Sequence, residues 1–136
     1  GIEPRFPMKF SRWVFWIAGA YGLLALLPQY FMEQKFGTDF PPAINHAEFY
    51  YGFLGVAIAW QVAFLIIGSE PLRYRPLMLP AILEKFSFAA AVIVLFVQNR
   101  LPTLIFAAGM IDLIWGVLFF IAWWRLGSQS AAQWNA

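Results

Sequence analysis

The sequence predicts an all-α integral membrane protein, a four-helix bundle with both termini on the cytoplasmic side. Hydrophobic residues make up 62% of the 136-residue chain and charged residues only 12%, whereas roughly a quarter of the residues of a soluble domain are charged. The apolar residues also gather in four runs, each close to the roughly 20 residues that a helix needs to cross a bilayer. We therefore expect a single transmembrane domain over residues 1–136, with the lipid bilayer as its first partner.

The four runs cover approximately residues 13–31, 48–67, 79–97 and 103–124. Four crossings return the chain to the side on which it began. Lys35 and Arg100 then lie on one side, and the other seven of the nine basic residues lie on the side of the termini: Arg5, Lys9, Arg12, Arg73, Arg75, Lys85 and Arg125. By the positive-inside rule, this distribution predicts cytoplasmic termini.

The charge and the rare reactive residues exclude several classes of function. The formal net charge is only +2 and is spread over loops and helix ends, so we expect no nucleic-acid partner. The chain has no cysteine and one histidine, His46, so we expect no metal site. Asn45 and Glu48 fit a capping box at the start of the second helix, which explains Glu48 without a functional role.

The connections and the small residues predict how the helices pack. The connection at residues 98–101 is short and should join the third and fourth helices in a tight hairpin. The connection at residues 32–47 is the longest and is the segment able to fold over the bundle. Small residues recur at spacings of three and four, which lets helices approach closely; they are Ala18, Gly22, Ala25, Gly52, Gly55, Ala59, Ala108 and Gly116.

Asp112 is the most informative single residue. It lies near the middle of the fourth apolar run, with no basic residue within a helical turn. A charged side chain at that depth is costly and is tolerated when a partner or a watery cavity receives it, so it is a functional-site hypothesis by default. The alternative is structural: an aspartic acid bonded across a helix interface to Gln61, a tryptophan or a tyrosine.

Glu84 and Lys85 form the second unusual position, near the start of the third run. Neighbouring residues on a helix project about 100° apart, so we expect at most one of the two to point into the bundle. Lys85 can extend its ammonium group to the cytoplasmic surface. Gln61 is the remaining polar side chain at a similar depth. We expect Glu84, Gln61 and Asp112 to line one inward-facing polar pocket.

Several segments resemble known membrane proteins. The runs Glu-Phe-Tyr-Tyr-Gly-Phe at 48–53, Arg-Tyr-Arg-Pro at 73–76 and Ile-Asp-Leu-Ile-Trp-Gly-Val-Leu-Phe at 111–119 resemble the small bacterial four-helix DoxX-like proteins. That resemblance implies a multi-pass protein of the bacterial inner membrane, in a broad group of which one branch is named for a thiosulfate-quinone oxidoreductase subunit. No catalytic residue of the group can be placed on this chain.

A second resemblance is to sterol isomerase type proteins, which enclose acidic residues in a bundle of four helices. It implies that Asp112 and Glu84 would contact a lipophilic ligand or move a proton. Trp60, Trp115 and Phe88 would then supply the aromatic wall of the pocket.

Three functions remain open from the sequence. The first is an accessory subunit that packs into a membrane complex or a homo-oligomer. The second is a binding module for an apolar molecule such as a lipid, quinone or pigment. The alternative is a membrane enzyme that transfers protons through its buried carboxylates. The candidate ligand-binding residues are Asp112, Glu84, Gln61, Trp60 and Trp115. No pattern identifies a catalytic residue or a cofactor.

Overall fold

The computed structural model describes residues 5–135 and the side chains of residues 7–127. The described residues form helices and no β-strand. In chain order they are α1 (Arg5–Leu26), the 3₁₀ helix η1 (Leu27–Phe31), α2 (Glu33–Asp39), α3 (Ala47–Ser69), the 3₁₀ helix η2 (Arg75–Leu77), α4 (Met78–Val97) and α5 (Thr103–Asn135). The predicted all-α fold class is confirmed.

Four helical segments are long and apolar enough to cross a membrane, which is the make-up of a multi-pass membrane protein. They are Pro7–Phe31, Ala47–Ser69, Arg75–Val97 and Thr103–Gly127, and each contains the run expected from the sequence. The fourth helix was expected to end near Trp124, but α5 continues to Asn135. The side chain of Arg5, one of the basic residues counted above, lies outside the described side chains.

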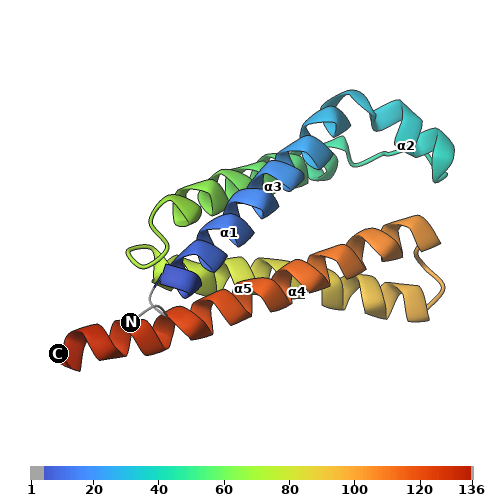
Figure 1. Cartoon of the computed structure of the whole chain (residues 1–136). Coiled ribbons are helices and arrows are strands. Elements are labelled where there is room, and N and C mark those ends of the chain that lie inside the picture. The colour runs from blue at the N-terminus through green and yellow to red at the C-terminus, as the bar shows by residue number, and fades with distance from the viewer. Residues whose placement is uncertain (1–4, 136) are drawn as a thin grey trace.

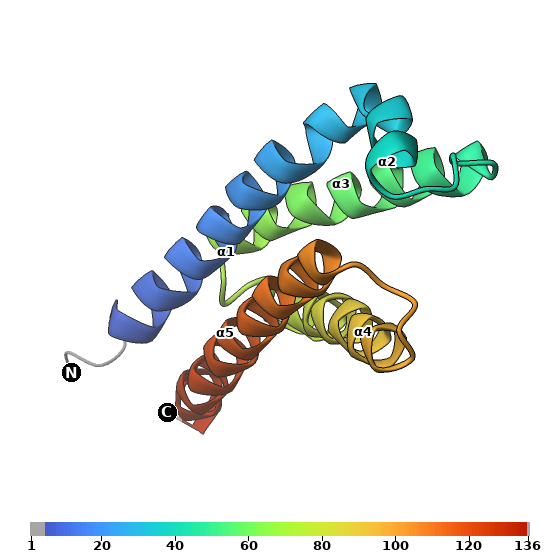
Figure 2. The ribbon, with the colours of Figure 1, turned by 90° about the vertical axis from the view of Figure 1, so that its right-hand side faces the viewer.

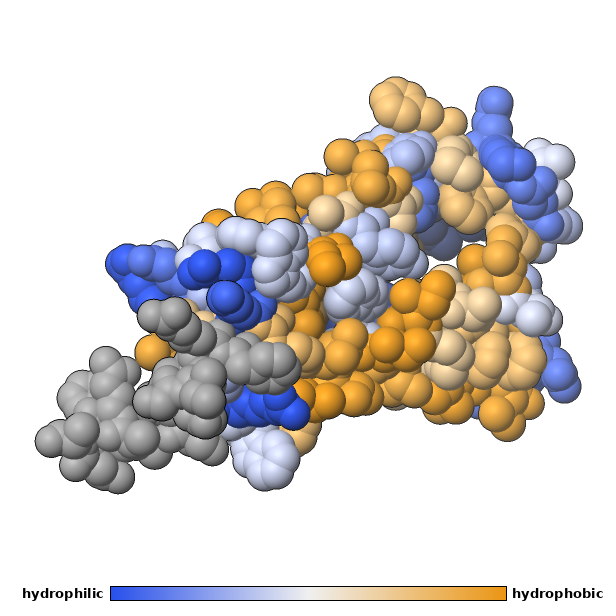
Figure 3. Space-filling view, in the orientation of Figure 1, coloured by the Kyte–Doolittle hydropathy of each residue, from blue (hydrophilic) through white to orange (hydrophobic). Residues whose placement is uncertain are grey.

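The helices are arranged as two pairs that diverge. α1 packs along α3 and α4 along α5, whereas α3 and α4 have few contacts with each other (Figures 1 and 2). Both termini and the α3–α4 turn lie at one end, here named the closed end, where the pairs meet. α2 and the loop between α4 and α5 lie at the other, the open end (Figure 1). The surface is apolar between two polar ends and hollowed between the pairs toward the open end (Figure 3).

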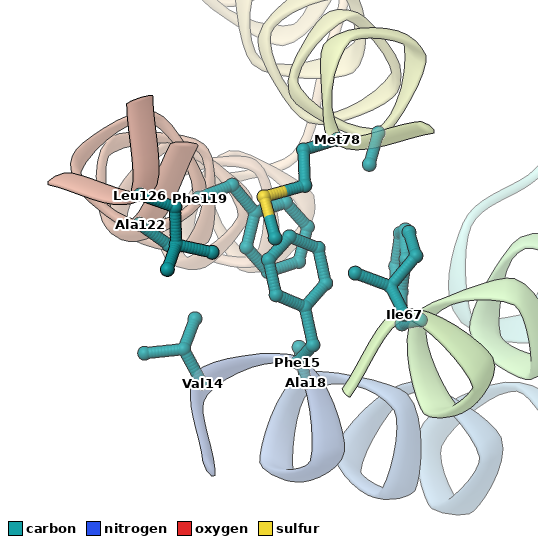
Figure 4. Packing of buried hydrophobic residues seen from close by; sticks show 10 residues of the cluster. Val14, Phe15, Ala18, Ile67, Met78, Phe119, Ala122 and Leu126 are labelled. Carbon is teal, nitrogen blue, oxygen red and sulfur yellow. The ribbon is translucent and has the colours of Figure 1, made fainter. Parts of the chain in front are cut away.

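The hydrophobic core lies at the closed end. Its largest members are three aromatic rings, Phe15 on α1, Phe64 on α3 and Phe119 on α5. The Phe119 ring centroid is 4.2 Å from that of Phe15 and 5.0 Å from that of Phe64. The buried residues around them come from all four long helices (Figure 4) and include Val14, Ala18, Ile67, Met78, Ala81, Ala122 and Leu126. Aromatic pairs of this geometry add to the energy of simple burial, so this cluster holds the two pairs together.

Glycines set the close approach of α1 and α3. A Cβ on Gly19 would lie 2.8 Å from the carbonyl oxygen of Gln61, and one on Gly68 would lie 3.0 Å from the carbonyl oxygen of Arg12. The Arg12 guanidinium donates to the Gly68 carbonyl at 3.2 Å, and the Trp16 indole donates to the Leu65 carbonyl at 3.2 Å. Gly68 is among the last four residues of α3, whose carbonyls lack partners within the helix, so Arg12 of α1 satisfies one of them.

The packing stripe expected from small residues is only partly correct. Ala18, Gly22 and Gly116 are buried, but Gly52, Gly55 and Ala59 are exposed, and so are Ala25 and Ala108. A Cβ on Gly52 would meet no neighbouring element of the described structure within 4 Å. The reason for the exposed glycines of α3 is their position on the helix: at 100° per residue they are turned away from Phe53 and Trp60, which face the space between the helix pairs.

The tight hairpin expected between the third and fourth helices is present as α4 and α5. Asn99 adopts a positive φ of 59°, and the Arg100 N–H donates to the Leu95 carbonyl at 2.9 Å. This is a common way to end a helix, with asparagine in place of glycine. Further along, Gly109 receives Val92 of α4, whose Cγ1 would be 2.5 Å from an added Cβ.

The capping box expected at the start of α3 is wrong. The N-cap position is His46, and no side chain caps the helix. Glu48 Oε1 instead lies 3.2 Å from Nδ1 of His46, with both side chains exposed. Because the helix begins at Ala47, Asn45 lies one position too early to receive its first N–H groups.

Candidate functional site

A cavity of about 340 Å³ lies between the two helix pairs, beyond the aromatic core. Its volume is within the range of roughly 300–1,000 Å³ that is usual for small-molecule sites. Residues from all four long helices line it, and Phe36 of α2 contributes from the open end. The wall is mainly apolar and aromatic, with Tyr21, Phe53 and Phe88. The polar side chains that line it are Gln29, Gln61, Glu84, Lys85 and Asp112.

Three charged side chains form a cluster on the cavity wall. Lys85 is only 4% exposed. Its Nζ donates to Asp112 Oδ1 at 3.4 Å and lies 3.7 Å from Glu84 Oε2. It also lies 5.2 Å from the ring centroid of Phe64, which connects the cluster to the core. An ammonium group between two carboxyl groups lowers the cost of keeping all three charges away from water.

This cluster corrects two expectations. Lys85 does not extend to the surface, and it is the partner of Asp112 in place of Gln61 or a tryptophan. Glu84 and Lys85 both line the cavity, although only one was expected to point inward. The reason is that α5 presents Asp112 directly to Lys85, so pairing inside the bundle replaces hydration at the membrane surface.

Gln61 brings an amide to the same cavity. It is 2% exposed, and its Nε2 donates to the Ala57 carbonyl at 2.9 Å. Its Oε1 has no hydrogen-bond partner among the described residues. A Cβ on Gly22 would collide with this oxygen, so glycine at that position on α1 leaves the space that the amide occupies.

The two tryptophans lie outside this cavity. Trp60 lines a neighbouring depression of about 260 Å³ between α3 and α4. That depression shares Phe53, Ala57, Glu84 and Phe88 with the cavity. Trp115 instead packs between Tyr21 and Phe119, with centroid distances of 6.2 and 6.3 Å. The structure therefore brings Asp112, Glu84 and Gln61 together as expected, with Trp60 at the side and Trp115 toward the core.

Sequence reasoning missed Lys85 as a member of the site, together with Tyr21, Gly22 and Phe36. A signal for Lys85 was present, since it is the one cation within an apolar run whose neighbouring run carries an unpaired carboxylate. No comparable signal marks Tyr21 or Phe36, because aromatic residues occur throughout the chain.

The fold and the site together define a helical, multi-pass membrane protein with a charged cluster on the wall of an interhelical cavity. No protein family, no curated protein and no solved structure matched this chain. The resemblance to the DoxX-like proteins therefore stays a prediction, and the site is interpreted from its own geometry.

Proposed function

We propose that this protein binds an apolar molecule with a polar head group in the cavity between its helix pairs. The observation that carries the proposal is the cavity itself, an aromatic chamber with Lys85, Glu84, Asp112 and Gln61 on one part of its wall. A few convergent polar groups in a mainly apolar pocket are the usual make-up of a small-molecule site. An ion pair that only stabilised the fold would not require a cavity beside it.

The depression beside the cavity supports a ligand from the bilayer. It is lined by residues of α3 and α4 alone, the two long helices that follow each other in the chain yet have few mutual contacts. Val56 and Phe53, on its rim, are exposed within an apolar span. An opening at this place faces hydrocarbon when the helices span a membrane, so the ligand would come from the lipid phase.

Filling the cavity should remove the ligand. Ala107 and Ala108 are both exposed, but only Ala108 lines the cavity. We expect Ala108→Phe to lose a small molecule that co-purifies with the wild-type protein, because the added ring occupies the space. Native mass spectrometry of gently extracted protein measures this loss, and Ala107→Phe is the matched control that should retain the ligand.

The same preparations separate the other two functions. A stoichiometric protein partner that Ala108→Phe still retains, without a small molecule, would favour the accessory subunit and contradict ligand binding. Two isomers related by a proton shift have the same mass, so they are separated by chromatography of the released ligand. Finding both isomers would favour the enzyme, with Glu84 and Asp112 as its carboxylates. Equal ligand content in Ala108→Phe and wild type would show that the cavity is not the binding site.

We further propose that the protein lies in the bacterial inner membrane with its closed end in the cytoplasm. The basic side chains support this orientation. Lys35 and Arg100 belong to the open end, and the closed end carries Lys9, Arg12, Arg73, Arg75 and Arg125. Lys85 lies inside the bundle, but without it the closed end still carries more basic residues than the open end.

A carboxy-terminal fusion to green fluorescent protein should fluoresce, while the matching fusion to alkaline phosphatase should be inactive. The reverse pattern would contradict the orientation.

A further inference from the structure

We infer that the ligand of this cavity carries a hydrogen-bond-donating head group, such as a hydroxyl or an ammonium, at the end of an apolar body. The inference rests on the proposed binding function and names the chemistry of the ligand. It follows from two independent features of the cavity wall, the unsatisfied polar atoms and the balance of charge.

The unsatisfied polar atoms on the cavity wall are both acceptors. Gln61 Oε1 is buried and receives no hydrogen bond from the described residues, whereas Nε2 of the same amide donates to the Ala57 carbonyl. Glu84 Oε2 likewise finds no hydrogen-bond donor in the described part of the chain, since Lys85 Nζ is 3.7 Å away, which is too far for a hydrogen bond. Buried acceptors of this kind are costly unless a ligand or water donates to them.

The charged donor of the cluster is already directed at carboxyl groups. The Lys85 ammonium donates to Asp112 Oδ1, and its charge is also attracted by the Glu84 carboxyl group, 3.7 Å away. A head group that only accepts hydrogen bonds, such as a quinone or an ester carbonyl, would have to compete with these carboxylates for Lys85. A donor head group meets free acceptors without breaking any contact.

The balance of charge favours a cationic donor over a neutral one. Two carboxyl groups, Glu84 and Asp112, face one ammonium group. With all three ionised, the cluster has one surplus negative charge in a region of low dielectric, where an uncompensated charge is expensive. The stacked rings of Phe53 and Phe88, with centroids 6.4 Å apart, add an aromatic surface that also favours a cation.

Four probes with one alkyl chain separate donation from charge. In dodecanol methyl ether a methyl group replaces the O–H donor of dodecanol, and in dodecyltrimethylammonium three methyl groups replace the N–H donors of dodecylammonium while the positive charge stays. Binding to the full-length protein in nanodiscs of zwitterionic phosphatidylcholine is measured by native mass spectrometry, with Ala108→Phe as the baseline for partition into lipid. We expect each donor to bind about tenfold more tightly than its methylated counterpart, the factor of one charge-assisted hydrogen bond.

Two conservative variants test which side chains cause the preference for donor head groups. Glu84→Gln removes the surplus charge, so dodecylammonium should lose its advantage over dodecanol while dodecanol still binds. Gln61→Met removes one acceptor at similar volume, so the preference of dodecanol over its methyl ether should shrink. Glu48→Gln, a matched change at an exposed carboxylate outside the cavity, should leave all four affinities unchanged.

The outcomes distinguish this inference from the proposed function. If the methylated probes bind as tightly as the donors and Ala108→Phe abolishes all binding, the cavity is a binding site but the head-group inference is wrong. If no probe binds above the Ala108→Phe baseline, the proposed function and the inference both fail. A donor preference that Glu84→Gln and Gln61→Met leave intact would also overturn the inference, because it would arise elsewhere.

Discussion

Replacing Lys85 with methionine is expected to be the most destabilising single change in this protein. Methionine keeps the length of the side chain and removes the charge, which leaves Glu84 and Asp112 facing each other on the cavity wall without their shared cation. Removing one partner of a buried ion pair costs about 3–5 kcal/mol. The free energy of unfolding, measured by SDS titration in mixed micelles, should fall by about that amount.

A triple variant provides the control for this prediction. Glu84→Gln and Asp112→Leu combined with Lys85→Met remove all three charges at similar size, and replacing a whole buried ionic cluster in this way is often neutral. The triple variant should therefore recover most of the lost stability, although the single Lys85→Met does not. A Lys85→Met protein as stable as the wild type would show that Lys85 does not neutralise the carboxylates.

The second large effect is expected at Gly68, where α1 crosses the last turn of α3. A methyl group there would lie 2.8 Å from Trp16 Nε1 and 3.0 Å from the Arg12 carbonyl oxygen, so either the ring or the helix backbone must move. Overpacking of this kind costs about 1–3 kcal/mol. Gly68→Ala should lower the unfolding free energy by that amount in the same SDS titration.

Gly52→Ala is the matched control on the same helix. No neighbouring element in the described part of the chain comes within 4 Å of the added methyl group, and alanine is the better helix former by about 1 kcal/mol, so this variant should be as stable as the wild type or more so. If Gly68→Ala and Gly52→Ala had the same effect on stability, α1 and α3 would not be in close contact at Gly68.

Much of the fold could be predicted from the sequence, because an apolar run of about 20 residues is long enough for one membrane crossing. The number of such runs therefore gives the number of crossings. The divergence of the two helix pairs could not be predicted. Gly52 and Gly68 are both glycines in the same apolar helix, yet one is exposed and the other is packed against Trp16. What separates them is the neighbouring helix, which the local sequence does not specify.

The polar half of the site was predictable for a related reason. Asp112, Glu84 and Gln61 stand out because polar side chains are rare at that depth in an apolar run. The position of Lys85 could not be predicted from its own helix, for which the membrane surface is the nearest polar environment. Its actual partner, Asp112, lies 27 positions along the chain, and only the hairpin brings the two residues together.

That hairpin has a consequence for how the protein enters the membrane. Glu84, Lys85 and Asp112 all belong to α4 and α5, and each charged residue near the centre of a lone helix resists insertion by about 2.5–3.5 kcal/mol. Because only residues 98–102 separate the two helices, we expect α4 and α5 to insert together as a hairpin, with the ammonium and carboxyl groups in contact. The ion pair would then lower the cost of inserting these charged segments as well as stabilising the finished bundle.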